Sequence, residues 1–115
     1  MRWEVLFDED FRTWFDAQAI GLQDEIISYG KLLSASGPLL GRPRVDTIQG
    51  SKFFNMKELR IQWKGDPWRI LFAFDPRRRS ILLVGGNKGG DKRWYDKNIP
   101  IADARLSKHL RSMEK

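Results

Sequence analysis

The sequence contains no cysteine among its 115 residues and only one histidine, His109. The absence of cysteine excludes a disulfide scaffold, a thiol nucleophile and a thiolate metal site, and it fits a reducing cytosol. A metal site would need a carboxylate cluster, and none has suitable spacing, so the sequence predicts neither a metal nor a cofactor. We expect His109 to be an ordinary packed or surface residue of a helix.

Long apolar runs are also missing. The longest, residues 81–84, is far shorter than the roughly 20 residues of a membrane-spanning helix. Residues 1–4 include charged side chains and do not begin a signal peptide. We therefore expect a cytoplasmic protein without a membrane segment. The length and the absence of repeats predict a single domain over residues 1–115.

Positive charge is abundant and unevenly distributed. The formal net charge is +6, and the sequence pI is near 9.9. Residues 1–56 carry a net charge of −2, so residues 57–115 carry +8. A positive field of this kind attracts nucleic acid or an acidic protein surface.

Hydrophobic residues make up 41% of the chain and can supply a core. Residues 3–7 are rich in β-favouring side chains and predict a short strand. Asp8 is expected to cap a helix, in which aromatic residues recur at helical spacing until the pattern breaks near Gly21. A second helix is predicted over residues 22–35. Together the two helices should form a hairpin that covers a sheet.

The remainder of the chain predicts a sheet and a last helix. Residues 36–52 are rich in turn-forming residues and predict a loop. The period then changes to 2, and short connections indicate an antiparallel meander. The predicted strands cover residues 53–64, 68–75 and 80–84 (with an extension to 87), and the predicted turns cover 65–67 and 76–79.

Glycine and proline mark the C-terminal elements. Gly85 and Gly86 are expected to end the last strand at a bulge. The glycine-rich segment that follows, residues 87–90, lacks the spacing of a phosphate-binding P-loop. Pro100 is predicted to begin the last helix, and residues 112–115 are expected to fray.

Alternation along the strands places two arginines on one face of the sheet. The large apolar side chains of 59–63 and 68–74 should pack under the N-terminal helices. Arg60 and Arg69 then share the opposite, less covered face, where guanidinium groups present a planar donor fork to phosphate. The alternative is that each arginine pairs with a neighbouring acid, for example Arg60 with Glu58 or Asp75.

Two further segments carry positive charge. Arg93, Trp94 and Tyr95 join a charge to two rings that could stack on RNA bases, although the rings could equally anchor the last helix to the sheet. The run of arginines at 77–79 is expected to be a turn with three solvated charges that add to electrostatic steering.

Three segments resemble the RelE/HigB toxin superfamily, in particular its phage-derived HigB-like branch. They are Glu58-Leu59-Arg60, residues 68–75 (WRILFAFD) and residues 82–88 (LLVGGNK). The resemblance implies an α+β, RelE-like fold. In that fold, an N-terminal strand and a two-helix hairpin pack on an antiparallel sheet, and a C-terminal helix follows.

The resemblance also implies a function. Such proteins are toxins of type II toxin–antitoxin pairs, typically ribosome-dependent mRNA endoribonucleases that use no metal. The implied partners are mRNA, the ribosome and a HigA-like helix-turn-helix antitoxin, which alone would contact operator DNA. The catalytic candidates are Arg60, Arg69, Lys88 and Tyr95. The RNA-binding candidates are Lys57, Arg93 and Trp94.

Two alternatives and one gap remain at this point. The superfamily includes ParE-type gyrase inhibitors, and the basic sheet face would also suit a non-catalytic RNA-binding module. The chemistry implied is attack of a ribose 2′-hydroxyl on the adjacent phosphate, which needs a proton acceptor. No histidine occupies the sheet region, so the general base is unidentified.

Overall fold

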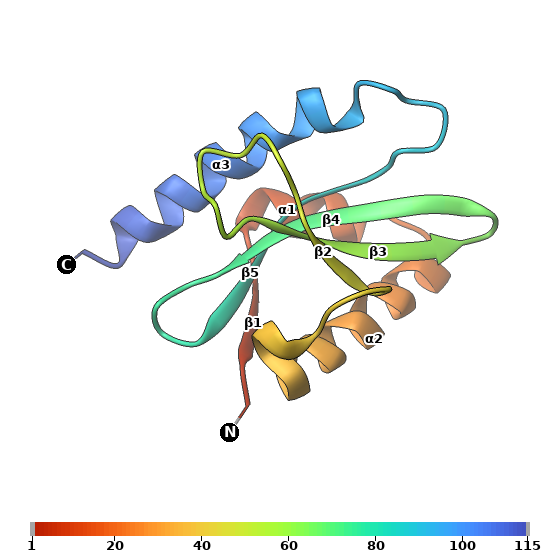
Figure 1. Ribbon diagram of the computed structural model, residues 1–115. Helices are drawn as coiled ribbons and strands as arrows, with labels where there is room; N and C mark the ends of the chain where they lie inside the picture. The colour runs from red at the N-terminus through yellow and green to blue at the C-terminus, as the bar shows by residue number, and fades with distance from the viewer. Residues whose placement is uncertain (1, 115) are drawn as a thin grey trace.

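The computed structural model describes residues 2–114, which form a five-stranded mixed sheet with helices on both faces (Figure 1). The strands lie in the order β1-β5-β4-β3-β2. The strands are β1 (Glu4–Phe7), β2 (Val45–Thr47), β3 (Lys57–Trp63), β4 (Asp66–Phe74) and β5 (Arg79–Asn87). The helices are α1 (Glu9–Asp16), α2 (Ile20–Ser36), the short 3-10 helix η1 (Gly37–Leu39) and α3 (Trp94–Ser112).

The antiparallel meander is confirmed for β3, β4 and β5. Trp63 pairs with Asp66 across a two-residue turn, in which Lys64 and Gly65 have φ values of 51° and 82°. Positive φ at both central residues matches the twist of the flanking strands. Asp66 and Pro67 therefore belong to β4, and the predicted turn over 65–67 began one residue too late and ended two residues too late.

Of the two outer strands, β1 confirms the strand predicted over residues 3–7, whereas β2 was not predicted. β1 pairs in parallel with β5, so the sheet is mixed. β2 lies within residues 36–52, which were predicted to be loop only, and pairs antiparallel with β3. Residues 53–56 were predicted to begin a strand but form a turn, in which the Met56 N–H donates to the Phe53 carbonyl.

The start of α1 follows its capping chemistry, whereas the start of α3 does not lie at the predicted proline. The carboxylate of Asp8 accepts from the backbone N–H groups of Asp10 and Phe11, which confirms its capping role. The prediction that Pro100 begins the last helix is wrong, because α3 begins at Trp94 and contains Pro100. Pro100 is exposed, so the carbonyl that its missing N–H leaves free lies on the solvent side of the helix.

The C-terminal end of α3 was predicted to fray. The helix ends at Ser112, and Lys115 lies outside the described residues. Among residues 2–114, no helix is both long enough and apolar enough to cross a membrane.

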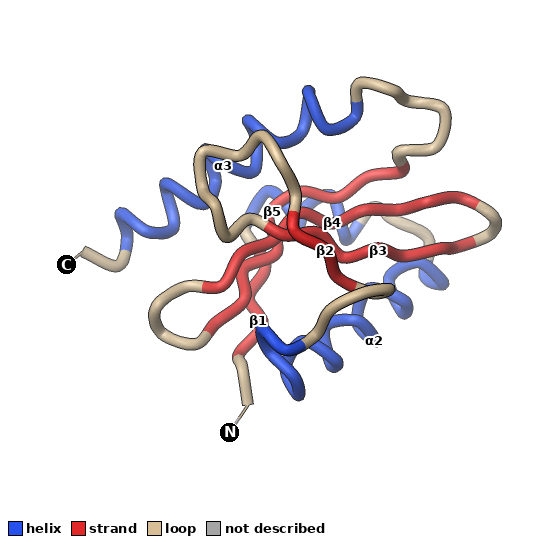
Figure 2. The backbone as a smooth tube through the Cα atoms, in the orientation of Figure 1, coloured by secondary structure: helices blue, strands red, loops and turns tan. Residues whose placement is uncertain are grey.

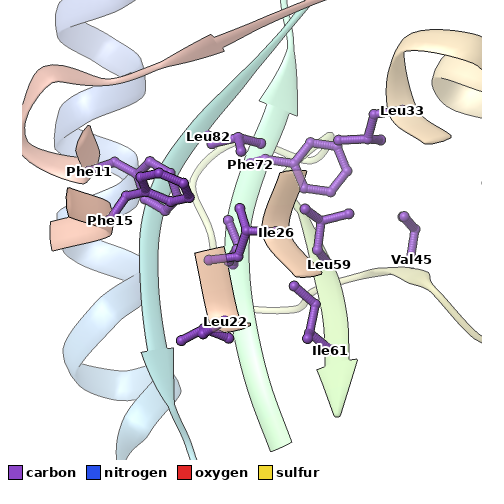
Figure 3. Close-up of a cluster of buried hydrophobic side chains, with 11 residues drawn as sticks. Phe11, Phe15, Leu22, Ile26, Leu33, Val45, Leu59, Ile61, Phe72 and Leu82 are labelled. Carbon is purple, nitrogen blue, oxygen red and sulfur yellow. The ribbon is translucent and has the colours of Figure 1, made fainter. Parts of the chain in front are cut away.

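The two N-terminal helices pack on one side of the sheet (Figure 2), and one apolar layer lies between them and the sheet, as predicted (Figure 3). Phe11 and Phe15 of α1 lie beside β5, and Leu22 and Ile26 of α2 lie over β4 and β3. Burial of a side chain of this size stabilises the fold by roughly 2 kcal/mol. The buried members are Phe11, Phe15, Leu22, Ile26, Leu33, Val45, Leu59, Ile61, Ile70, Phe72 and Leu82.

The opposite face is more covered than predicted. The helix α3 lies across it together with the segment between β2 and β3 (Figure 1). The buried members of this second layer are Met56, Leu71, Ala73, Ile81, Leu83, Val84, Trp94, Ile99, Ala102 and Leu106. The charged residues predicted for this face therefore lie in a partly enclosed site.

Gly85 and Gly86 do not end β5, and the register shift lies opposite Leu71 and Phe72 of β4, where the register skips Leu83 of β5. Both glycines allow a close approach. A Cβ atom on Gly85 would lie 2.5 Å from the Trp14 ring, and one on Gly86 would lie 2.6 Å from Trp94 Nε1. Because Trp14 is in α1 and Trp94 in α3, the two glycines allow one tryptophan to contact each face of the sheet.

Candidate functional site

A cluster of charged and polar side chains on the α3 face is centred on Glu58, whose exposed fraction is 4%. Its Oε2 accepts a hydrogen bond of 2.9 Å from Arg60, and its Oε1 accepts one of 2.6 Å from the Tyr95 hydroxyl. Arg69 Nε lies 3.7 Å from the same Oε1. We call Glu58, Arg60, Arg69 and Tyr95 the Glu58 cluster.

The strand register explains why these groups meet. Arg60 and Arg69 lie directly opposite each other on β3 and β4, as the alternation predicted. Two like charges at such a pair destabilise a sheet. Glu58 precedes Arg60 by two residues and so shares its face. The ion pair between Arg60 and Glu58 that was considered as an alternative does form, whereas Asp75 pairs elsewhere.

Arg69 has hydrogen-bonding capacity that its neighbours leave unused. Its exposed fraction is 5%, and its Nη1 donates to the Trp68 carbonyl over 3.0 Å. Its Nε is buried and has no hydrogen-bond partner among the described residues. An unsatisfied buried donor is costly, so an additional anion near this guanidinium would be stabilised.

Tyr95 brings a proton donor from the first turn of α3. Burial raises its pKa to about 12, and the hydrogen bond to Glu58 and the charge of Glu58 act in the same direction. The hydroxyl therefore stays protonated at neutral pH and can donate but not accept a proton. Lys88 Nζ lies 5.7 Å from the centre of the Tyr95 ring, which places this predicted residue at the rim of the cluster.

Two cavities adjoin the cluster. The first has a volume of about 330 Å³, and the second has a volume of about 360 Å³. The first is lined by Thr47, Ile48, Gln49, Glu58 and Tyr95. The second is lined by Arg42, Pro43, Arg60, Gln62 and Arg69. Each is large enough for part of a nucleotide, and both reach the β2 side of the sheet.

The three residues predicted to bind RNA lie outside the cluster. Trp94 is 4% exposed and packs in the layer beneath α3, which supports the anchoring interpretation over stacking on bases. Arg93 is exposed and directly precedes α3. Lys57 lies on the face of β3 opposite to Arg60, as alternation predicted, and pairs with Thr47 and Phe72 in the sheet.

A second buried carboxylate, Asp75, lies at the far end of β4, about 20 Å along the strand from Arg69. Arg79 Nε and His109 Nε2 lie 2.8 Å and 2.9 Å from its Oδ2. His109 is thus a packed helix residue, as expected. The prediction of three solvated arginines at 77–79 is wrong for Arg79, and Arg78 lies over the Trp3 ring at 4.5 Å.

Burial alone would raise the pKa of Asp75. Hydrogen bonds from His109, Arg79 and two backbone N–H groups outweigh that effect and hold the pKa below its ordinary value of 3.8. We call Asp75, Arg79 and His109 the Asp75 cluster. Within residues 2–114, no group of three or more histidine, aspartate or glutamate side chains is arranged to hold a metal ion.

Sequence reasoning missed Glu58 as the centre of the site, and it missed Arg42. Glu58 was considered only as a partner for Arg60. Its position two residues before an arginine on the same strand face was the available signal. Arg42 lies in a segment predicted to be loop, and no pattern linked it to β3.

Three comparisons relate the chain to known proteins. Residues 13–107 match the family described as "Phage derived protein Gp49-like (DUF891)". A Mycobacterium tuberculosis protein named "Putative toxin HigB3" is 52% identical over 109 residues, which are 94% of each protein. Another from the same organism, "Putative toxin HigB2", is 49% identical over 108 residues, covering 92% of this chain and 54% of that protein.

The fold also resembles a solved structure. A variant of the E. coli toxin RelE with two arginines replaced by alanine, in the free state, superimposes with a TM-score of 0.65. The match covers 92% of this chain and 99% of the RelE chain at 11% identity. At that identity the likeness concerns the fold alone, and it confirms the predicted RelE-like architecture.

Proposed function

The chain belongs to the phage-derived Gp49-like family and to the RelE/HigB toxin superfamily, and from this premise we propose that it is a toxin that cleaves mRNA in a type II toxin–antitoxin system. The names of its two mycobacterial relatives support the toxin class. The Glu58 cluster supports the chemistry. Residues 1–115 would form one toxin domain.

The observation that carries the proposal is the convergence of a carboxylate, a protonated phenol and two guanidinium groups beside open cavities. Metal-independent RNA cleavage needs a proton acceptor, a proton donor and positive charge at the phosphate. The cluster contains one group for each requirement. Glu58 supplies the general base that the sequence left unidentified.

In this mechanism, the Glu58 carboxylate takes the proton of a ribose 2′-hydroxyl. The 2′-oxygen then bonds to the adjacent phosphorus, and the bond from phosphorus to the 5′-oxygen breaks. Tyr95, which is protonated at neutral pH, donates its proton to that leaving oxygen. The products are a 2′,3′-cyclic phosphate and a 5′-hydroxyl, and proton exchange with water restores Glu58 and Tyr95.

Arg60, Arg69 and Lys88 would stabilise the charge that grows on the phosphate oxygens. The side chain of Arg60 is 31% exposed and that of Arg69 only 6%, so Arg60 is the more direct contact. In the free protein Glu58 neutralises both arginines. A bound phosphate would take over part of that role and release Glu58 for proton transfer.

The further partners follow from the same proposal. The ribosome would order the mRNA in the site, so that positioning contributes much of the rate. A HigA-like helix-turn-helix antitoxin would neutralise the toxin and carry the contacts to operator DNA. The site of action would be the cytoplasm. Arg93 stays a candidate for an RNA contact at the edge of the site, whereas Lys57 lies on the opposite face of the sheet.

The experiment compares two arginines that each pair with an acid. We expect Arg60→Ala to abolish growth arrest and the new mRNA 5′ ends that primer extension detects after induction. Arg12→Ala is the matched control, because Arg12 also pairs with an acid but lies on α1, which packs on the opposite face. It should behave as the wild type does.

Other outcomes would overturn the proposal. If Arg60→Ala cleaves mRNA at the wild-type rate, the Glu58 cluster is not the catalytic site. Induction of DNA damage before any loss of translation would indicate a ParE-type inhibitor. Growth arrest without new 5′ ends on ribosome-bound mRNA would indicate an RNA-binding protein that does not cut.

A further inference from the structure

The second cavity beside the Glu58 cluster has a composition that suits an anion. Three of its five lining residues are arginines, namely Arg42, Arg60 and Arg69, and none of the five is acidic. The remaining two are Pro43 and Gln62, and the Gln62 amide adds hydrogen-bond donors. We call this cavity the Arg42 pocket.

The Arg42 pocket is lined in part by a buried side chain and not by surface side chains alone. Arg69 is 5% exposed, and its buried Nε has no hydrogen-bond partner among the described residues. Arg60 faces it across the strands. Two guanidinium groups are therefore held together in a partly desolvated place, where the single carboxylate of Glu58 is shared between them, which favours an additional anion.

The pocket continues the site along β3. Glu58, Arg60 and Gln62 point to the same face, at intervals of roughly 7 Å. Glu58 lines the first cavity, Gln62 lines the Arg42 pocket, and Arg60 contacts Glu58 and also lines the pocket. A single RNA strand that crosses this face would place the cleaved phosphate against Arg60, beside Glu58, and the neighbouring phosphate in the Arg42 pocket.

Arg42 can reach such a phosphate without disturbing the fold. Its side chain is 71% exposed and is held by Asp46, with Nη2 2.6 Å from Oδ2. Exposed ion pairs of this kind are weak, so a phosphate can compete for the guanidinium. The other guanidinium nitrogens of Arg42 have no hydrogen bonds among the described residues.

We infer that the Arg42 pocket binds the phosphodiester adjacent to the one that is cleaved, with Arg42 as its principal binding residue. This inference rests on the proposed function, because it assigns a second phosphate of the same substrate. Contacts to phosphates position a nucleic acid without reading its sequence. Arg42 is accordingly a binding residue and takes no part in proton transfer.

The test uses the full chain and a short single-stranded RNA with a 2′-deoxy substitution that blocks cleavage. Arg42→Gln should weaken binding at low salt about 10-fold and lower the slope of log affinity against log salt by about 0.7, the contribution of one phosphate. Arg12→Gln is the matched control, since Arg12 is also an exposed arginine paired with an aspartate four residues later. It should leave both quantities unchanged.

Two further variants separate the pocket from general charge effects. Asp46→Asn frees Arg42 and should bind at least as tightly as the wild type, and Arg42→Gln with Asp46→Asn should bind as weakly as Arg42→Gln alone. A neutral methylphosphonate in place of the phosphate on one side of the cleavage site should weaken wild-type binding about 10-fold. The same substitution should not weaken binding by Arg42→Gln further.

The outcomes distinguish this inference from the proposed function. If the wild type cleaves mRNA but Arg42→Gln binds the RNA with unchanged affinity and salt slope, the assignment of a phosphate to the Arg42 pocket is refuted. The proposed nuclease function is then unaffected. Failure of the wild type to bind the uncleavable RNA at low salt, or a methylphosphonate effect on neither side, also refutes the pocket. If the wild type never cleaves yet Arg42→Gln shows the predicted losses, the nuclease fails and the phosphate pocket stands.

Discussion

Three carboxylates are buried among the described residues, those of Glu58, Asp75 and Asp103. The first two are surrounded by similar groups but differ in how many of the neighbouring hydrogen-bond donors have a partner. Glu58 contacts two arginines and a tyrosine, and Asp75 contacts an arginine, a histidine and backbone N–H groups. Both lie on β-strands or at their ends, and each has a partner on α3. Composition alone would not tell them apart.

Their hydrogen bonds do tell them apart. Asp75 Oδ1 accepts from the N–H groups of Arg77 and Arg79, while its Oδ2 receives Arg79 and His109. This cluster closes the β4–β5 turn and ties α3 to it. The Glu58 cluster instead keeps a buried unpaired donor on Arg69 and adjoins two cavities. We infer that the Asp75 cluster, whose carboxylate oxygens are fully hydrogen-bonded, serves stability. The Glu58 cluster, which keeps a donor without a partner, serves binding and catalysis.

The largest effect should come from Glu58→Gln, which keeps the shape of the side chain and removes its charge. Loss of a general base typically lowers the rate by about 100-fold or more. We therefore expect cleavage of ribosome-bound mRNA to fall by at least about 100-fold, while circular dichroism shows a folded protein. A cleavage rate within about threefold of the wild-type rate would contradict a catalytic role for the Glu58 cluster.

Asp75→Asn should produce the opposite pattern. Removing a buried, ion-paired carboxylate should lower the free energy of unfolding by about 2 kcal/mol, because Arg79 and the backbone donors lose a charged acceptor. Cleavage at a permissive temperature should stay near the wild-type rate. Denaturant unfolding measures the first quantity, and a catalytic loss larger than the loss of folded protein would contradict the assignment.

The same variant gives a pH dependence. Because the folded pKa of Asp75 is depressed below 3.8, its stabilisation is present above about pH 4 and is lost as the pH falls through the folded value. The difference in unfolding free energy between the wild type and Asp75→Asn should thus shrink below pH 4. A difference that stays constant down to pH 3 would contradict the depressed pKa.

Tyr95→Phe should have an intermediate effect. We expect kcat to fall about 10-fold with KM nearly unchanged, because the proton donor acts in the transition state. Since the folded pKa is raised to about 12, the stabilisation by Tyr95 is present below pH 10 and is lost as the pH rises from 10 to 12. Spectroscopic titration of tyrosinate in the wild type and the variant checks the value.

The smallest effect separates two lysines on opposite faces of the sheet. Lys88→Ala should lower cleavage about fivefold, because Lys88 lies against Tyr95 and adds positive charge at the rim of the site. Lys57→Ala, on the other face, should change it less than about twofold. Equal losses in a steady-state cleavage assay would show that the charge field as a whole, and not its position, determines the rate.

Local chemistry made much of the fold predictable from the sequence. The period-2 pattern located β3 to β5 and the faces of Arg60 and Arg69, and the carboxylate of Asp8 marked the start of α1. What failed depends on contacts between distant segments. β2 is three residues long and exists because β3 offers an unpaired edge, and α3 extends through Pro100 because Trp94 and Ile99 are buried beneath it.

The site was predictable only in part, for the same reason. Strand alternation could place Arg60 opposite Arg69, and the family resemblance added Lys88 and Tyr95. Neither source could show that the Tyr95 hydroxyl contacts Glu58, which is 37 residues away in the sequence, or that Arg42 lies beside β3. Whether the donors of an arginine find hydrogen-bond partners depends on the packed structure. The sequence therefore could not show that Arg79 Nε has a partner and that Arg69 Nε has none among the described residues.

The two glycines of β5 have an evolutionary consequence. Gly85 lies against Trp14, and Gly86 lies against Trp94 on the opposite face, so each position is constrained by a different helix. The two pairs should therefore covary independently among relatives. Where a smaller residue replaces the tryptophan of α1, an alanine should be tolerated at position 85, and the same holds for position 86 and the tryptophan of α3. The residues found at positions 85 and 86 in relatives would then indicate how closely α1 and α3 approach the sheet.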